Sequence, residues 1–117
     1  MKISKVLNNN VVITTDEKQN EIIVMGRGIA FKKKVGQHIS DSEVEKTFVL
    51  DSQDRLEHFS YLLSRADDQL ILLVNELVQY GEKEIGKSAN DYLYLALLDH
   101  LSFALKRAKK DQYLRSP

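Results

Sequence analysis

A chain of 117 residues can form one domain of ordinary size, or a small domain joined to part of a second. It has no cysteine, which excludes disulfides, thiolate metal sites and cysteine nucleophiles; because signal-peptide and membrane-length apolar patterns are also missing, a cytoplasmic protein without membrane association is expected. The 17 basic and 17 acidic residues balance overall, but basic residues outnumber acidic ones by seven to three over residues 1–36 and acidic residues outnumber basic ones by ten to four over residues 51–105. A polyanionic partner is therefore expected for the first segment and disfavoured for the second.

The first fifty residues read as short antiparallel strands separated by turns. The predicted strands cover residues 2–7, 11–15, 21–25 and 47–50. The cluster Asn8-Asn9-Asn10 between the first two is a hairpin signal, because asparagine tolerates the positive φ values of tight turns. A sheet of this size buries little apolar surface by itself, so we expect it to pack on something, and a dimer is the simplest solution.

After residue 51 the apolar spacing becomes helical. A stripe begins at Leu56, a second helix is predicted over residues 69–85 with Gly86 suited to its C-terminus, and a third opens at Asn90 with good capping chemistry. The surplus of apolar positions predicts an incomplete bundle, and the final Ser116-Pro117 suggests a cut within a linker. The expected fold class is α+β, with a small antiparallel four-stranded sheet followed by an α-helical module.

The strongest local feature is the segment of residues 25–34, which reads MGRGIAFKKK. Arg27 offers a planar fork for phosphates and base edges, and Phe31 offers a face on which an unpaired base can stack. Gly26 and Gly28 allow a sharp turn and a close approach of another surface. The alternative is that the glycines only make a turn, Phe31 belongs to the core and the lysines form a solvated edge.

The remaining polar residues give weaker signals. The three asparagines can serve as turn residues, and their amides can also read base edges. The histidines His38, His58 and His100 have no spacing that builds a metal site. His100 lies in an apolar helical stretch directly after Asp99, where a carboxylate can orient or charge the imidazole. Neither a catalytic triad nor a carboxylate pair emerges, so no enzymatic activity, metal or cofactor is expected.

Several spaced motifs closely resemble the co-antiterminator RNA-binding domain of the BglG/SacY/LicT family of bacterial antiterminators. They are MKI at residues 1–3, KVLNNN at 5–10, VMGRGIAFKKK at 24–34 and VEKTF at 44–48. The stretch DYLYLALLDHLSFA at 91–104 resembles the part of the family's first regulatory domain that bears its first histidine. In the family, that domain is regulated by proteins of the sugar phosphotransferase system. The resemblance thus implies an RNA-binding domain at residues 1–55 and the truncated start of the first regulatory domain at 56–117.

The resemblance also implies a function and a set of site residues. The family sheet dimerises into a barrel-like unit and grips an RNA hairpin, which prevents an overlapping terminator from forming. The implied RNA-binding residues are Lys5, Asn8, Asn10, Gly26, Arg27, Gly28, Phe31 and Lys33, of which Lys5 and Lys33 are the weaker candidates. His100 corresponds to the phosphorylated position, and phosphotransferase proteins are the implied phosphoryl donors.

One alternative from a different class stays open. The chain could be a phosphoacceptor or protein-interaction module whose N-terminal sheet serves dimerisation only, and affinity for an RNA hairpin distinguishes the two. In either case a phosphohistidine must reach the active site of its donor. His100 is therefore expected to lie at least partly accessible, at the margin of a buried stripe.

Overall fold

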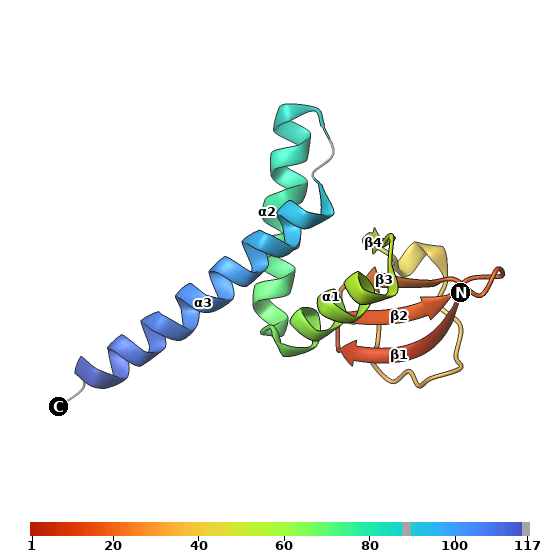
Figure 1. Ribbon diagram of the computed structural model, residues 1–117, viewed down its shortest axis with the longest axis horizontal. Helices are drawn as coiled ribbons and strands as arrows, with labels where there is room; N and C mark the ends of the chain where they lie inside the picture. The colour runs from red at the N-terminus through yellow and green to blue at the C-terminus, as the bar shows by residue number, and fades with distance from the viewer. Residues whose placement is uncertain (88–89, 116–117) are drawn as a thin grey trace. The chain divides into compact units, whose positions relative to one another are not determined.

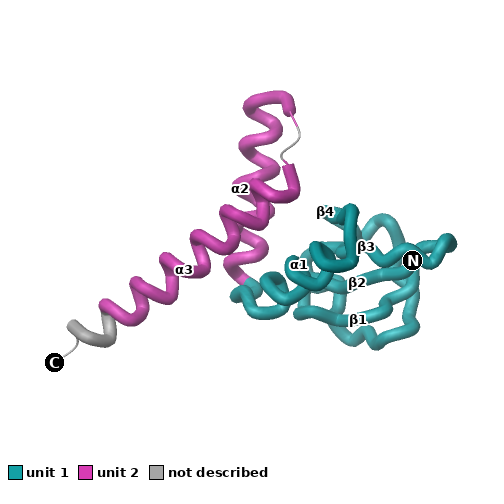
Figure 2. Tube along the Cα trace, in the orientation of Figure 1, with its two compact units in different colours: residues 1–68 teal, residues 69–117 magenta. Residues whose placement is uncertain are grey.

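The computed structural model describes residues 1–87 and 90–115, so the predicted linker at Ser116-Pro117 lies outside the described residues. The elements follow in the order β1 (Lys2–Asn8), β2 (Val11–Thr15), β3 (Glu21–Met25), the short 3-10 helix η1 (Asp41–Glu43), β4 (Lys46–Phe48), α1 (Gln53–Arg65), α2 (Asp68–Ile85) and α3 (Asp91–Arg115). Figure 1 labels the strands and the α-helices. The α+β class is confirmed. The chain divides into two compact units, residues 1–68 and 69–117, coloured separately in Figure 2.

The sheet is antiparallel throughout, with its strands in chain order β1-β2-β3-β4. The first three strands match the prediction to within one residue, and the fourth begins one residue earlier and ends two residues earlier than expected. The register places Ile13 opposite Ile23, and Ile23 opposite Phe48, so these three side chains share one face. Val12 and Val24, which are also opposite each other, lie on the other face.

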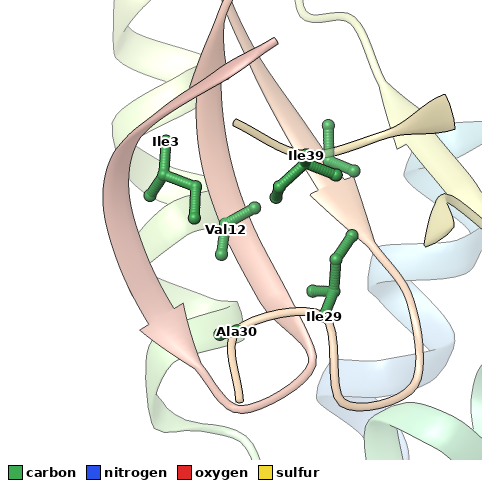
Figure 3. Close-up of a cluster of buried hydrophobic side chains, with 6 residues drawn as sticks. Ile3, Val12, Ile29, Ala30 and Ile39 are labelled. Atoms are coloured by element: carbon green, nitrogen blue, oxygen red, sulfur yellow. The ribbon is translucent and has the colours of Figure 1, made fainter. Parts of the chain in front are cut away.

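The face that carries Val12 and Val24 is covered by the loop between β3 and β4. Its buried cluster combines strand and loop residues: Ile3, Val12, Val24, Ile29, Ala30 and Ile39. Figure 3 shows side chains from the strands and from the loop meeting in this cluster. Because these loop side chains are buried, the loop backbone is held against the sheet.

The opposite face of the sheet packs against α1. Ile13, Ile23 and Phe48 are buried, and α1 contacts β1 and β3 while burying its own Leu56 and Leu63, among others. The helix begins after Ser52, whose hydroxyl accepts a hydrogen bond from the Arg55 amide. This apolar face of the sheet is therefore buried by a helix of the same chain, so a dimer is not needed to bury it.

The second unit contains most of α2 together with α3. Two local predictions hold there: Gly86 ends α2 with a φ of 77°, and the Asn90 side chain caps α3 by accepting from the Tyr92 amide at 2.7 Å. Tyr94 is buried, and its hydroxyl reaches the Ile71 carbonyl oxygen at 3.5 Å. Among the described residues, no helix has the length and apolarity needed to span a bilayer.

Candidate nucleic-acid interface

The segment after β3 forms a series of tight turns that alternates anchored and exposed residues. Amide-to-carbonyl hydrogen bonds run from Ile29 to Gly26 at 3.1 Å, from Phe31 to Gly28 at 3.0 Å and from Lys33 to Ala30 at 3.1 Å. Ile29 and Ala30 are buried in the cluster of Figure 3, whereas Arg27 and Phe31 are exposed. The buried pair fixes the backbone, so the two exposed side chains project from a rigid support.

Phe31 is not a core residue. Its side chain is 66% exposed, and the Nζ atom of Lys32 lies 5.4 Å from the ring centroid. With this exposure the ring contributes little of the free energy that burial of an aromatic side chain gives to a fold. The structure thus excludes the alternative that placed Phe31 in the core, and leaves the ring available for stacking.

The asparagine turn, residues 8–10, accepts hydrogen bonds from the glycine turn through both backbone and side-chain oxygens. The Gly26 amide donates to the Asn10 carbonyl oxygen at 2.9 Å, and the Ala30 amide donates to the Asn9 carbonyl oxygen at 3.0 Å. Asn10 is 5% exposed, and its Oδ1 accepts from the Gly28 amide at 2.7 Å. This oxygen of Asn10 therefore positions the glycine turn.

The two glycines are required for different reasons. A Cβ built on Gly26 would lie 2.2 Å from the carbonyl oxygen of Glu43, so this position has no room for a side chain. Gly28 has open space around its Cα, but its φ of 67° is one that other residues seldom adopt. Gly26 is thus a point of close approach, and Gly28 is a conformational requirement.

An acidic segment, residues 41–45, lies beside the basic turn. The Arg27 amide donates to Glu45 Oε2, and the Lys33 ammonium forms an ion pair with Glu43 Oε1. The hydrogen bond from Lys33, followed by one from the Ser40 amide, lowers the pKa of the Glu43 carboxyl below its ordinary value. Sequence reasoning missed both glutamates; the excess of acidic residues after the lysine run was the available signal.

Two of the expected RNA-binding residues lie beside α1 rather than in the glycine turn. Lys5 lines a hollow together with α1 residues, including Glu57 and Tyr61. Asn8 donates through Nδ2 to the Leu63 carbonyl oxygen at 2.9 Å, while its Oδ1 accepts from the Asn10 amide. The structure therefore gathers Asn10, Gly26, Arg27, Gly28, Phe31 and Lys33 around one turn and places the Lys5 and Asn8 side chains along the helix.

The histidines are dispersed. His100 is exposed on α3 in the second unit, His58 lies next to the Phe59 ring in α1, and His38 forms an isolated bridge with Lys2. Among the residues that the structure describes, no group of three or more His, Cys, Asp or Glu side chains is placed to hold a metal ion.

A hydrogen-bonded turn that presents exposed cations and an exposed aromatic ring, on a small antiparallel sheet, is an arrangement suited to proteins that bind nucleic acid. Residues 1–57 match the family model of the CAT RNA binding domain. The chain is 41% identical over 110 residues to the transcription antiterminator LicT of Bacillus subtilis (strain 168), covering 94% of this chain and 40% of LicT. It is 35% identical to the beta-glucoside operon antiterminator of Dickeya chrysanthemi, covering 99% of this chain and 41% of that relative.

The fold has a solved counterpart. The crystal structure of GlcT CAT-PRDI matches with a TM-score of 0.78 and 34% identity, covering 94% of this chain and 66% of that one. The N-terminal half of the chain, residues 1–57, thus belongs to the CAT RNA-binding domain family, and over most of its length the chain is similar to transcription antiterminators. It spans about two-fifths of the length of the two curated relatives. Their names are those of transcription regulators rather than enzymes, in agreement with the expectation of a non-enzymatic protein.

Proposed function

We propose that this chain binds an RNA hairpin through the turn around Arg27 and Phe31 and thereby acts in transcription antitermination. The observation that carries the proposal is that Arg27 and Phe31 are both exposed on one turn, whose backbone is hydrogen-bonded to Asn10. The chemistry suits a hairpin with unpaired bases, because such a base can stack on the ring while the guanidinium holds a phosphate or a base edge. The basic excess of residues 1–36 adds sequence-independent attraction.

Antitermination follows from mass action. A protein that binds one of two mutually exclusive RNA hairpins stabilises that hairpin and lowers the population of the other. If the bound hairpin overlaps a terminator, transcription continues past it. The expected partner is therefore an element of an mRNA leader, met in the cytoplasm.

Hairpin binding is tested with a labelled RNA that carries asymmetric internal loops, using the variants Arg27→Ala and Phe31→Ala. Loss of stacking at Phe31 should cost about 1–3 kcal/mol of binding free energy, which is a factor of roughly 5 to 150 in Kd. Matched controls are Lys18→Ala, an exposed cation in the turn after β2, and Tyr80→Ala, an aromatic residue 67% exposed on α2. If both turn variants bind like the parent while their circular dichroism is unchanged, the assignment of this turn is wrong.

Read-through is tested separately by transcription in vitro from a template on which the hairpin overlaps a terminator. Adding the protein should raise the fraction of full-length transcript, and Arg27→Ala should need a higher protein concentration for the same effect. Hairpin binding without any change in the full-length fraction would contradict antitermination while leaving RNA binding in place.

The proposal includes a homodimer. Both faces of the sheet are covered within one chain, so this part rests on the family resemblance and not on exposed apolar sheet surface. Sedimentation equilibrium of the whole chain at micromolar concentration should give twice the mass of 13.4 kDa. A monomer that still binds one hairpin would contradict it.

His100 is the proposed phosphoacceptor, with phosphotransferase-system proteins as donors. Its exposure on α3 supports this, since a donor can reach the imidazole without local unfolding. A phosphoryl group there adds negative charge beside Asp99 and alters the local electrostatics of α3. Mass spectrometry after incubation with an active relay should place acid-labile phosphate on His100, with His58→Ala as the control variant and His100→Ala as the negative one.

The two halves of this proposal are separable. Phosphate on His100 in a chain without hairpin affinity would favour the alternative, a phosphoacceptor or interaction module. Hairpin affinity without phosphate on His100, with the relay shown active on another substrate, would leave RNA binding in place and remove the phosphoacceptor role.

A further inference from the structure

The ion pair between Lys33 and Glu43 removes one cation from the basic turn. The Lys33 side chain is 21% exposed and that of Glu43 is 39% exposed, so the pair is only partly open to water. Lys33 was expected to contact a phosphate, yet its ammonium is already in contact with a carboxylate of the same chain. A phosphate oxygen that binds this ammonium must take the place of Glu43 Oε1.

Glu43 is held firmly in that place. It ends η1 in a capping box, where its Oε2 accepts from the Ser40 amide at 3.1 Å and from the Ser40 hydroxyl at 3.4 Å. Its own carbonyl oxygen lies against Gly26, which leaves the backbone no room to move toward the turn. The two oxygens of one carboxylate thus have separate partners, and releasing Lys33 does not release Glu43.

We propose that Glu43 is an internal competitor for RNA phosphate, which keeps Lys33 out of the phosphate contacts of the hairpin. The inference rests on the proposed RNA binding and concerns how many RNA phosphates the turn contacts. A free lysine attracts any RNA through its charge, whereas the fork of Arg27 and the ring of Phe31 need a particular geometry. Neutralising Lys33 lowers the affinity for all RNA by a similar factor, so a larger share of the remaining binding free energy comes from Arg27 and Phe31.

The test compares Glu43→Gln with Asp41→Asn. Both substitutions remove one negative charge from η1, and the amide introduced by Glu43→Gln keeps an oxygen for Ser40, but among these two positions only Glu43 is ion-paired with Lys33. Dissociation constants are measured from 50 to 300 mM salt, for the hairpin and for an unrelated RNA duplex. Release of Lys33 should steepen the slope of log K against log salt by about 0.7–0.9, the value for one additional phosphate contact.

The expected result has three parts. Glu43→Gln binds both RNAs more tightly, by a similar factor and with the steeper slope. Asp41→Asn changes the slope by less than half as much. Lys33→Gln leaves the parent's slope unchanged and abolishes the gain when combined with Glu43→Gln.

The inference is overturned if Glu43→Gln keeps the parental slope, if Asp41→Asn matches it, or if Lys33→Gln alone flattens the slope of the parent by a full contact. The last result would mean that Lys33 already binds phosphate. A parent that binds neither RNA refutes the proposed function, and with it this inference. A parent whose binding depends on Arg27 but not on Glu43 refutes the inference alone. Circular dichroism and the urea midpoint of Lys33→Gln, which leaves η1 intact, show whether loss of the pair itself disturbs the fold.

Discussion

Replacing Gly26 with alanine should damage both the fold and the binding surface. The new Cβ would lie 2.2 Å from the Glu43 carbonyl oxygen, whereas ordinary contacts begin at 3.4 Å, so the two segments would have to separate by about 1.2 Å. Overpacking of a closely packed site costs about 1–3 kcal/mol. Separation also weakens two hydrogen bonds at about 0.5–1.5 kcal/mol each, from the Glu45 amide to Met25 and from the Arg27 amide to Glu45. We expect a loss of about 3 kcal/mol in the free energy of unfolding.

Urea unfolding followed by circular dichroism measures this loss, and two other glycines serve as controls. Gly28→Ala meets no atom within 4 Å and should lose only about 1–2 kcal/mol from its positive φ. Gly81→Ala, inside α2 and also without a neighbour within 4 Å, should stabilise its helix by about 0.5–1 kcal/mol. If Gly26→Ala is as stable as the parent, the close approach of the acidic segment to the turn is not a feature of the folded protein.

Three further results are expected. Asn10→Ala leaves the Gly28 amide without its acceptor and should cost about 1–3 kcal/mol in urea unfolding and weaken hairpin binding, whereas Asn10→Asp keeps the acceptor and should be less harmful. Leu63→Ala should lower the free energy of unfolding by about 2–5 kcal/mol and speed amide exchange in β3, since Leu63 is fully buried in the sheet unit. Unchanged exchange in β3 would contradict the packing of α1 on the sheet. The pKa of Glu43 is depressed, so its pair with Lys33 stabilises the fold at pH values above the ordinary carboxyl pKa, and this stabilisation is lost as the pH falls through the lowered pKa. In an NMR titration, Lys33→Gln should raise the pKa of Glu43.

Local sequence signals predicted most of the elements. The strands, the asparagine turn, Gly86 at the end of α2 and Asn90 at the start of α3 all depend on residues within a few positions of each other. Each has a reason that does not need the rest of the chain: alternating apolar residues favour strands, and particular side chains permit particular φ values or cap helix ends. The residue types of Arg27 and Phe31 indicated RNA binding in the same local way, but only the structure shows that Phe31 is exposed and not part of the core.

Three features needed the tertiary structure. Periodicity indicated that α1 is a helix, but not that it would cover the face with Ile13 and Phe48, because an apolar stripe does not specify its partner. The sequence indicated Asn10 as a turn residue that could also contact a base, and only the fold shows that its Oδ1 accepts from the Gly28 amide, eighteen positions away. Likewise Glu43 reaches Lys33 only because the loop packs Ile29 and Ile39 against the sheet and so brings the acidic segment beside the turn. Hydrogen bonds and ion pairs between separated segments depend on how the whole chain packs, and no local pattern encodes them.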